Sequence, residues 1–345
     1  MSSKTLTLYP SPHVLKLLAL HHRLPTHHER YQLIQKKVNN ELAGFHGEKR
    51  MLYPLSKFQS YCKILPNIRL NLHTHHFQMD FLIISPKFIL ILESKYYSDD
   101  LLFDDTVHQV IQQKGQETRV YDDPVLQVEE QAYQLSNWLD RFNLSNLPIE
   151  HYVVMTNSNT RLQIESTNTH HAQRVISLQR LPSLFRELIG KHENSLSVKE
   201  INLLADQISQ NHKPYIPDIL QVNKIDRSEI NSGVFCMNCG SLGMRMIRRR
   251  WQCTECGCRE KLAHEHALKD YYLLFGGEIT NREFRSFTGL ESGSTAKDML
   301  IRSTDNRSGE KYRRKYYLNY NYRSVDFNYL IQLNKQIRSR ALVRS

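Results

Sequence analysis

Hydrophobic and polar positions in the first hundred residues predict a helix followed by three strands. Apolar side chains recur at mostly helical spacing across residues 28–46, and Gly44 and Gly47 predict the end of that helix. Three β-prone runs follow, at residues 61–72, 78–84 and 87–97. The turn signal Ser85-Pro86 separates the last two runs, so these strands can pair as an antiparallel hairpin.

A second helix and a fourth strand continue the pattern. Residues 98–121 are polar and aperiodic and predict a loop. Pro124 stands where a first helical turn tolerates proline, and residues 125–139 carry a helical stripe of apolar side chains. Residues 151–155 predict a further buried strand. The order helix, three strands, helix, strand predicts an α/β core with a mixed sheet.

The last third of the chain predicts smaller helical elements. A helix is expected over residues 266–275, a capping-box pattern at residues 280–283 opens a second, and Ser294 or Thr295 can cap a third. Two short helices joined by a glycine-containing turn resemble a helix-turn-helix, and residues 311–323 can form a β wing. A plain helical subdomain explains the same pattern.

Composition and charge indicate what kind of partner the protein binds. The chain has 345 residues, 40% of them apolar and 10% aromatic, which is typical of a soluble globular protein with two or three domains. Lys and Arg number 46 against 35 Asp and Glu, and residues 231–345 alone hold 21 Lys/Arg and 11 Asp/Glu. A basic excess confined to the last third indicates a polyanionic partner, most commonly nucleic acid.

Two features bear on the compartment. Residues 1–10 lack the positive start and apolar run of a secretory signal, and the most apolar stretch, residues 81–92, falls short of the ~20 apolar residues of a membrane span. Four of the six cysteines form two pairs at metal-ligand spacing, which is typical of a reducing compartment. We expect a cytoplasmic protein without a membrane partner, and the sequence does not identify its oligomeric state.

Carboxylates gather around the predicted hairpin. Asp80 lies near the start of one strand, and Glu93 and Lys95 lie near the end of the next, on the same face because side chains alternate along a strand. Two carboxylates on one patch suit Mg²⁺ or Mn²⁺, and Lys95 can orient the attacking water or stabilise charge developing on a phosphate. Glu48 can add a further ligand. The alternative is that these charges are a solvated strand end.

Four ordered motifs carry a resemblance to a known family. They are Gly44-Phe45-His46-Gly47-Glu48, Gln78-Met79-Asp80, Glu93-Ser94-Lys95 and Asp123-Pro124-Val125-Leu126-Gln127. Over residues 28–158 the chain resembles the nuclease-related domain, NERD, a branch of the PD-(D/E)xK nuclease superfamily. The resemblance implies a restriction-endonuclease-like fold, with Glu48, Asp80, Glu93 and Lys95 at the metal site and Gln127 on a helix that faces it. The sequence departs from the family pattern at Met79, where many superfamily members have proline, and at Ser94, where NERD domains often have valine.

A cysteine-rich segment predicts a second metal site. Cys236, Cys239, Cys253 and Cys256 form the pattern C-x2-C-x13-C-x2-C, which resembles a zinc ribbon. Four thiolates complete a tetrahedral Zn²⁺ site without an open position, so the expected role of zinc is structural. Cys258, His264 and His266 are close enough in sequence to replace one ligand.

Basic residues lie inside this segment and beyond it. Arg248, Arg249 and Arg250 precede Trp251, and an arginine run beside an aromatic ring suits phosphate contact and stacking on an exposed base. The alternative is a solvated basic hairpin with Trp251 packed on the ribbon. In the helix-turn-helix hypothesis, Lys297 and Arg302 also face DNA.

These features together predict the domains and the function. The expected domains are a NERD nuclease-like domain at residues 28–190, a helical linker at 191–232, a zinc ribbon at 233–260 and a basic, helix-turn-helix-like region at 261–345. The leading hypothesis is a Mg²⁺- or Mn²⁺-dependent deoxyribonuclease directed to DNA by its C-terminal regions. One alternative is a DNA-binding or regulatory protein on an inactive nuclease scaffold, and another is an adaptor whose zinc ribbon binds protein.

Overall fold

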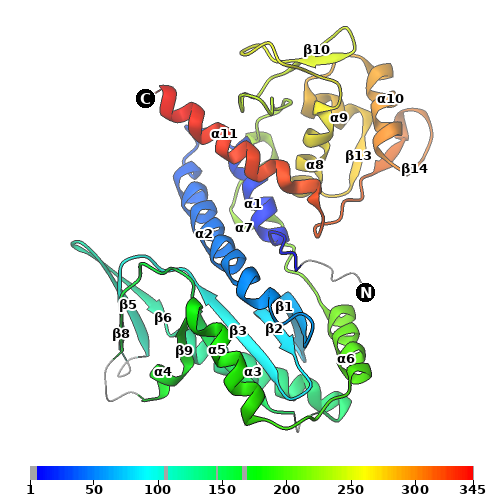
Figure 1. The fold of residues 1–345 in the computed structure, drawn as a ribbon. Coiled ribbons are helices and arrows are strands. Elements are labelled where there is room, and N and C mark those ends of the chain that lie inside the picture. Colours follow the sequence, from blue (N-terminus) through cyan, green and yellow to red (C-terminus); the bar gives the residue numbers. More distant parts are fainter. Residues whose placement is uncertain (1–5, 105–107, 145–146, 165–168, 345) are drawn as a thin grey trace. The chain divides into compact units, whose positions relative to one another are not determined.

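The computed structural model describes residues 6–104, 108–144, 147–164 and 169–344. The chain divides into two compact units, and neither is one continuous segment. We name residues 1–8 and 42–214 the central unit, and residues 9–41 and 215–345 the terminal unit. Residues 9–41 therefore belong to the same unit as the C-terminal third of the chain (Figure 1).

A five-stranded mixed sheet forms the core of the central unit. Its order is β1-β2-β3-β7-β9, with β1 at Lys63–Leu72, β2 at His75–Ile84, β3 at Ile89–Lys95, β7 at Ile149–Met155 and β9 at Val175–Ser177. β1, β2 and β3 pair antiparallel, and β3, β7 and β9 pair parallel. The predicted strands, the hairpin between β2 and β3 and the mixed α/β core are confirmed.

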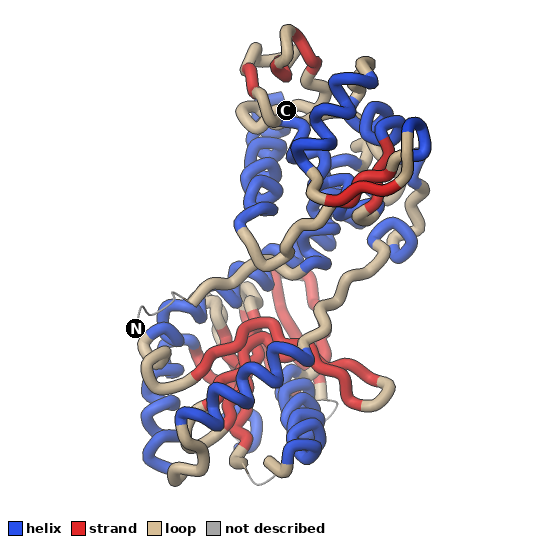
Figure 2. The backbone as a smooth tube through the Cα atoms, turned by 90° about the vertical axis from the view of Figure 1, so that its right-hand side faces the viewer, coloured by secondary structure: helices blue, strands red, loops and turns tan. Residues whose placement is uncertain are grey.

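Helices cover both faces of this sheet (Figure 2). The covering helices are α2 (Tyr31–Ser56), α3 (Pro124–Leu139), α5 (Leu181–Lys191) and α6 (Val198–Asn211), and the short α4 (Thr169–Arg174) precedes β9. The apolar stripes of α3 and α6 pack on one face, and α5 and the end of α2 pack on the other. Two separate apolar clusters therefore sandwich the sheet, and the expected helix over residues 125–139 is confirmed.

Two expectations for the central unit are wrong. Residues 98–121 were expected as a loop, but most of this segment forms strands of a second sheet; residues 105–107 lie outside the described part. That sheet has the order β6-β5-β4-β8, with β4 at Asp100–Asp104, β5 at Gln109–Lys114, β6 at Glu117–Asp122 and β8 at Leu162–Ile164. Leu101, Phe103 and Val110 are part of the core, a short apolar pattern that the polar average of the segment conceals.

The first predicted helix also continues past its expected end. α2 runs through both Gly44 and Gly47 to Ser56. Glycine weakens a helix by about 1 kcal/mol relative to alanine, but packing of Phe45, Met51 and other apolar side chains outweighs that local preference.

The terminal unit is mostly helical. Its helices are α1 (Pro12–Arg23), α7 (Ile219–Val222), α8 (Ala263–Phe275), α9 (Asn281–Thr288), α10 (Gly293–Ser303) and α11 (Asn328–Arg344). Sequence reasoning did not identify α1, whose residues from Val14 to Arg23 are all buried. It correctly identified α8 and the capping box that opens α9, but the cap of α10 is Ser292 rather than Ser294 or Thr295.

Two small antiparallel sheets complete the terminal unit. One contains β10 (Arg245–Ile247), β11 (Arg250–Gln252) and β12 (Arg259–Glu260), and the other contains β13 (Glu278–Thr280), β14 (Asn306–Ser308) and β15 (Lys315–Tyr317). The predicted C-terminal helical region is confirmed, and its elements follow the order α8, β13, α9, α10, β14, β15, which is that of a winged helix. Among the described residues, none of the helices has the length and apolar character that crossing a membrane requires.

Candidate functional site

The register of the β2–β3 hairpin brings the expected carboxylates together. Phe81 pairs with Leu92, so Asp80 and Glu93 are the next residues along the two strands. The backbone N–H of Ser94 donates to Asp80 Oδ2 at 2.9 Å, which fixes this carboxyl group at the end of β3. One tight turn at residues 85–88 therefore brings Asp80 and Glu93 together from two different strands.

Glu93 lies at the centre of a hydrogen-bond network on the α3 face of the sheet. Lys95 Nζ donates to Glu93 Oε1 at 2.9 Å and to Gln127 Oε1 at 2.9 Å. Gln127 Nε2 also donates to Glu93 Oε1 at 2.9 Å, and Gln131 Nε2 donates to Glu93 Oε2 at 3.1 Å. Glu93 is 4% exposed, so these donors offset the cost of burying its charge.

Helix α3 is positioned to supply the two amides. Asp123 caps its N-terminus by accepting from Val125 N at 2.8 Å, and Pro124 occupies its first turn. Asp123 Oδ2 also lies 2.5 Å from Nε2 of the buried His171. Gln127 and Gln131 are four residues apart and therefore share one face of the helix.

Helix α2 brings Glu48 to the same edge. Asn67 Nδ2 donates to Glu48 Oε2 at 3.0 Å, and Asn67 lies on β1 opposite Asp80 because its neighbours pair with Phe81 and Met79. The preceding residue, Gly47, permits this approach: a Cβ there would lie 2.8 Å from Thr156 Oγ1 and 2.9 Å from Tyr96 Cβ. Gly47 is thus needed for packing rather than for ending the helix.

The local charges act on Asp80 and Lys95 in opposite senses. Burial raises the pKa of Asp80 well above its usual range, and the negative charges of Glu93 and Glu48 raise it further. Burial lowers the pKa of Lys95, but the neighbouring Glu93 carboxylate outweighs burial, so the pKa of Lys95 lies above its usual value. The surroundings therefore favour the charged form of Lys95 and disfavour the charged form of Asp80, which a further positive charge would favour.

The donor set fits a hard divalent cation. The carboxylates of Glu93 and Glu48 both lie close enough to Asp80 to raise its pKa, and carboxylate oxygens with water are the ligands that Mg²⁺ prefers. Glu93 Oε1 already accepts from both Lys95 and Gln127, so Asp80 Oδ1 and the second lone pair of Glu93 Oε2 remain as positions for an ion.

Comparison with known proteins identifies the domain that contains this edge of the sheet. A family model described as Nuclease-related domain matches residues 43–156. Residues 43–156 form a nuclease-related domain. The matched range of this NERD domain contains Glu48, Asp80, Glu93, Lys95 and Gln127. No curated protein and no solved structure matches the chain.

The four expected zinc ligands also come together. The sulfur atoms of Cys236, Cys239, Cys253 and Cys256 all lie within 4.8 Å of one another. Gly240 and Gly257 follow the two Cys-x-x-Cys turns with φ of +73° and +70°, a backbone conformation that favours glycine. The cluster is compatible with a structural zinc ion and includes Cys256 rather than Cys258, while His264 accepts a hydrogen bond from Trp251 instead.

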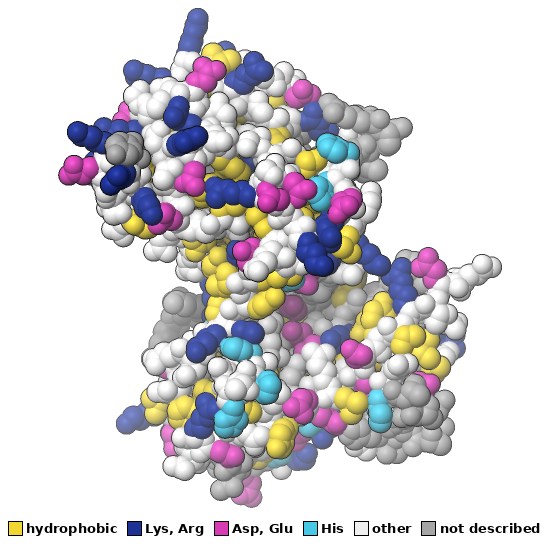
Figure 3. All heavy atoms as spheres, turned by 180° about the vertical axis from the view of Figure 1, so that it is seen from behind, with side chains coloured by type: hydrophobic (Ala, Val, Ile, Leu, Met, Phe, Trp, Pro, Cys, Tyr) yellow, Lys and Arg dark blue, Asp and Glu magenta, His cyan; other side chains and the backbone are white. Residues whose placement is uncertain are grey.

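That bond corrects the expectation for Trp251. The indole is 1% exposed and donates from Nε1 to His264 Nδ1 at 3.2 Å, so its ring packs on the ribbon and offers no face to a base. Arg248, Arg249 and Arg250 are all exposed at the tip of the β10–β11 hairpin. Figure 3 shows exposed Lys and Arg side chains on the face that it draws.

The arginine turn has an unusual backbone. Ile247 pairs with Arg250, which leaves Arg248 and Arg249 as a two-residue turn, and both have positive φ, +50° and +64°. Such a turn normally uses asparagine or glycine. Each arginine in this conformation costs about 1 kcal/mol or more, so their presence at the tip points to a role for the side chains rather than for the turn.

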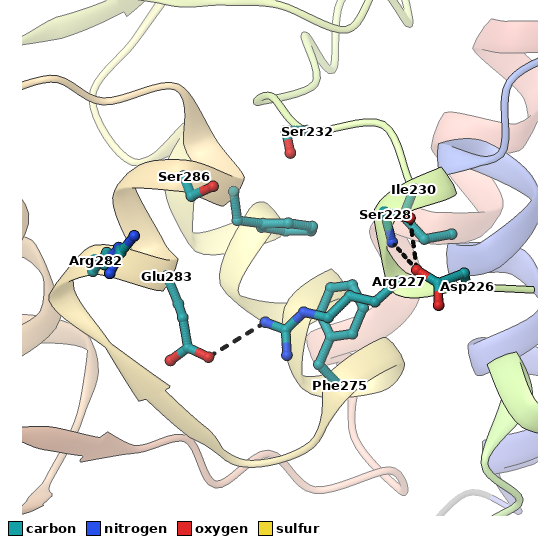
Figure 4. A pocket seen from close by; sticks show the side chains of 10 residues that line it. Asp226, Arg227, Ser228, Ile230, Ser232, Phe275, Arg282, Glu283 and Ser286 are labelled. Carbon is teal, nitrogen blue, oxygen red and sulfur yellow. Dashed lines mark hydrogen bonds and ion pairs between the residues drawn. The ribbon is translucent and has the colours of Figure 1, made fainter.

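A further pocket lies elsewhere in the terminal unit (Figure 4). Its volume is about 580 Å³, and Arg227 crosses it to Glu283 at 3.5 Å. Asp226 and Arg282 also line it, so its charges are of both signs. The pocket contains none of the predicted site residues.

Sequence reasoning missed two polar side chains of the candidate site. Asn67 contacts Glu48, and Gln131 contacts Glu93. Gln131 lies one helical turn after Gln127, so the helical spacing of α3 was a usable signal. Asn67 carried none, because its position opposite Asp80 depends on strand register.

Proposed function

We propose that this protein is a metal-dependent nuclease that hydrolyses DNA phosphodiester bonds, with its zinc ribbon and basic C-terminal region binding the DNA. The observation that carries the proposal is the shared edge of Asp80, Glu93 and Lys95 inside the NERD domain. Like-charged carboxylates held together beside a single lysine are costly in a folded protein unless a cation joins them.

The proposed roles follow from the contacts. Asp80 and Glu93 hold Mg²⁺ or Mn²⁺, and Glu48 supports them directly or through water. The ion supplies Lewis-acid activation of the phosphate and a more acidic bound water. Lys95 Nζ, held by Glu93 and Gln127, orients the attacking water or stabilises charge on the phosphate oxygens. Gln127 and Gln131 fix the rotamer of Glu93.

The same proposal assigns DNA contacts to the terminal unit. Arg248, Arg249 and Arg250 contact phosphates from the tip of the ribbon hairpin, and Lys297 and Arg302 contact DNA from α10. The zinc ion holds the ribbon that presents the arginines. Support comes from the exposure of these five side chains and from the basic excess of residues 231–345.

A cleavage assay with a matched variant tests the proposal. Labelled linear, circular and single-stranded DNA are incubated with the full chain in Mg²⁺, in Mn²⁺ and without divalent cation. We expect cation-dependent cleavage that Asp80→Asn and Glu93→Gln each abolish, because each variant removes one negative ligand with little change of shape. Glu117→Gln, an exposed carboxylate on β6, is the control and should cleave as the wild type does.

The outcomes separate the alternatives. Cleavage that survives in both Asp80→Asn and Glu93→Gln overturns the proposed site. Salt-sensitive DNA binding without cleavage in any cation identifies a DNA-binding protein on an inactive scaffold instead. An absence of both cleavage and salt-dependent binding favours an adaptor.

A further inference from the structure

Another pocket of the terminal unit lies beside the zinc ribbon. Its volume is about 420 Å³, and three segments of the terminal unit contribute to its wall: residues 21–31, residues 231–255 and residues 337–340 of α11. Ligand pockets of proteins have volumes of about 300–1,000 Å³, so this pocket has room for a small organic group. We name it the histidine pocket, because His21, His22 and His27 belong to its wall.

Two buried histidines of this pocket have unused hydrogen-bonding capacity. His21 is 3% exposed, and in the part of the chain that the structure describes neither of its ring nitrogens has a hydrogen-bond partner. His22 Nε2 lies 3.3 Å from Asn334 Oδ1, whereas His22 Nδ1 has no partner among the described residues. The large majority of buried side-chain polar atoms are paired with protein or ordered water. Unpaired nitrogens in the wall of one pocket therefore indicate that the pocket holds a ligand, or waters, that complete them.

Both histidines are held in their neutral form. Burial lowers the pKa of His21 to about 4, and the positive charge of Arg338 acts in the same direction. Burial also lowers the pKa of His22 to about 3. A neutral imidazole donates from one ring nitrogen and accepts with the other, so the two rings offer a ligand both kinds of hydrogen bond without a charge.

The rest of the wall favours a flat and uncharged ligand. Tyr31 stacks on His21 with ring centroids 5.1 Å apart, and Phe235 adds a second aromatic ring. The two side chains of the wall that carry a full charge, Glu255 and Arg340, pair with each other at 2.7 Å. An isolated anion would therefore find the cation of this pocket already paired.

A nucleobase meets these requirements. Base edges carry neighbouring hydrogen-bond donors and acceptors, and protein pockets that accept a single base combine hydrogen bonds to its Watson–Crick edge with contacts from aromatic and apolar side chains. A metal ion does not meet them, because the described residues of this wall form no group of three His, Cys, Asp or Glu side chains placed to share an ion.

We infer that the histidine pocket binds one unpaired base of a nucleic acid strand. The inference rests on the proposed function and names its substrate class, DNA that contains an unpaired base. A base inside a duplex cannot enter the pocket, because its hydrogen-bonding edge is paired and its faces are stacked. A strand is favoured over a free nucleoside as the source of the base, since residues 231–345 hold 21 Lys/Arg against 11 Asp/Glu and basic side chains attract the phosphates of a strand.

Binding to matched probes tests the inference. Fluorescence anisotropy follows the full chain binding to a fully paired DNA duplex, to the same duplex with one extra unpaired base, and to one of its single strands. Ca²⁺ replaces Mg²⁺, and gels verify that the probes stay intact. A thermal-shift series with adenosine, guanosine, cytidine and thymidine tests a free nucleoside as the ligand.

Two variants change the wall of the pocket, and a third serves as the control. His21→Phe keeps an aromatic ring beside Tyr31 and removes both nitrogens. Because those nitrogens have no partner among the described residues, we expect the free energy of unfolding to stay the same or to rise. Asn231→Leu removes an exposed amide from the wall at similar volume. The control is Asn40→Leu, at an exposed position of α2 in the terminal unit.

We expect the wild type to bind the single strand and the duplex with an unpaired base about fivefold or more tightly than the fully paired duplex. His21→Phe and Asn231→Leu should each reduce this preference to about twofold or less, while Asn40→Leu keeps it. A wild type without the preference overturns the inference, as does a His21→Phe variant that binds the three probes as the wild type does. Stabilisation by free nucleosides without a preference among the DNA probes also overturns it, because the ligand is then a nucleoside.

The same probes in Mg²⁺ separate this inference from the proposed function. Cation-dependent cleavage without the binding preference contradicts the role of the histidine pocket alone. A binding preference without cleavage in any cation contradicts the nuclease function alone.

Discussion

Two carboxyl groups, that of the half-buried Asp80 in the central unit and that of the buried Asp270 in the terminal unit, have opposite surroundings. Arg23 Nε donates to Asp270 Oδ2 at 2.7 Å, and Tyr329 OH donates to Asp270 Oδ1 at 2.5 Å. Burial raises the pKa of Asp270, and the Arg23 guanidinium opposes that rise. At Asp80 burial also raises the pKa, but the charges of Glu93 and Glu48 act in the same direction.

The difference separates the structural role of Asp270 from the metal-binding role proposed for Asp80. Asp270 has its cationic partner, Arg23, inside the protein, and we call these two residues the matched pair. Arg23 also donates to the carbonyls of Asn231 and Gly233, at 3.1 Å and 3.2 Å, and so connects α1 to the C-terminal segments. Asp80 has like charges around it, and Lys95 only partly offsets them. A buried charge with its partner present stabilises the fold, whereas a group of like charges is tolerated where a ligand supplies the missing charge.

Breaking the matched pair should have the largest effect on stability. Arg23→Ala leaves Asp270 buried without its cation, and we expect a loss of about 3–5 kcal/mol in the free energy of unfolding. Trp251 is one of the two tryptophans of the chain and lies in the terminal unit, so urea unfolding is followed by its fluorescence in a Trp138→Phe background.

The paired change Arg23→Met/Asp270→Asn serves as the control for this prediction. It removes both charges, and the asparagine oxygen still accepts from Tyr329. We expect it to recover a large part of the stability that Arg23→Ala loses. A loss below about 1 kcal/mol for Arg23→Ala would contradict the structural role of the pair.

Removing the single cation of the carboxylate group should affect the reaction more than the fold. Lys95→Ala takes away the ammonium group held by Glu93 and Gln127, and we expect Mg²⁺-dependent kcat to fall by about 10²–10³-fold. Glu93 keeps its amide donors, so the protein should still fold, as circular dichroism can verify. Lys199→Ala is the charge-matched control, and an unchanged kcat in Lys95→Ala would remove Lys95 from the proposed mechanism.

Local sequence patterns predicted the approach of Asp80 to Glu93 but not the pairing of Arg23 with Asp270, for a physical reason. Asp80 and Glu93 are joined by one tight turn, so strand periodicity was enough to bring them together. Arg23 and Asp270 are 247 residues apart, and only tertiary folding pairs them. The same limit explains why α1 and Asn67 were missed, and why the glycines of α2 predicted a helix end that packing overrides.

A substitution of Gly47 tests whether the arrangement of Asp80, Glu93 and Glu48 depends on the close approach of α2 as well as on charge. Gly47→Ala forces a Cβ against Thr156 and Tyr96, and we expect a loss of about 1–3 kcal/mol, with weaker cleavage because Glu48 follows directly. Gly44→Ala is the matched control in the same helix: nothing lies within 4 Å of its Cβ, so a gain of up to about 1 kcal/mol is expected. Urea unfolding that shows equal effects would contradict the packing role of Gly47.

The smallest expected effect is on the stability of a variant of Asp80, and it is the most direct test of the comparison between Asp80 and Asp270. Asp80→Asn removes one of the like charges and keeps an oxygen for Ser94 N–H. A carboxyl group whose folded pKa is raised stabilises the fold at low pH and loses that contribution as pH rises through the folded pKa.

The gain from Asp80→Asn should therefore be absent at acidic pH and grow towards pH 8 when no divalent cation is present. Trp138 reports on the central unit in a Trp251→Phe background. Mg²⁺ should reverse the order, because it stabilises the wild type by about 2.7 kcal/mol at a hundred times its Kd and the variant by less. A variant less stable than the wild type at pH 8 without cation would mean that Asp80, like Asp270, is matched within the protein.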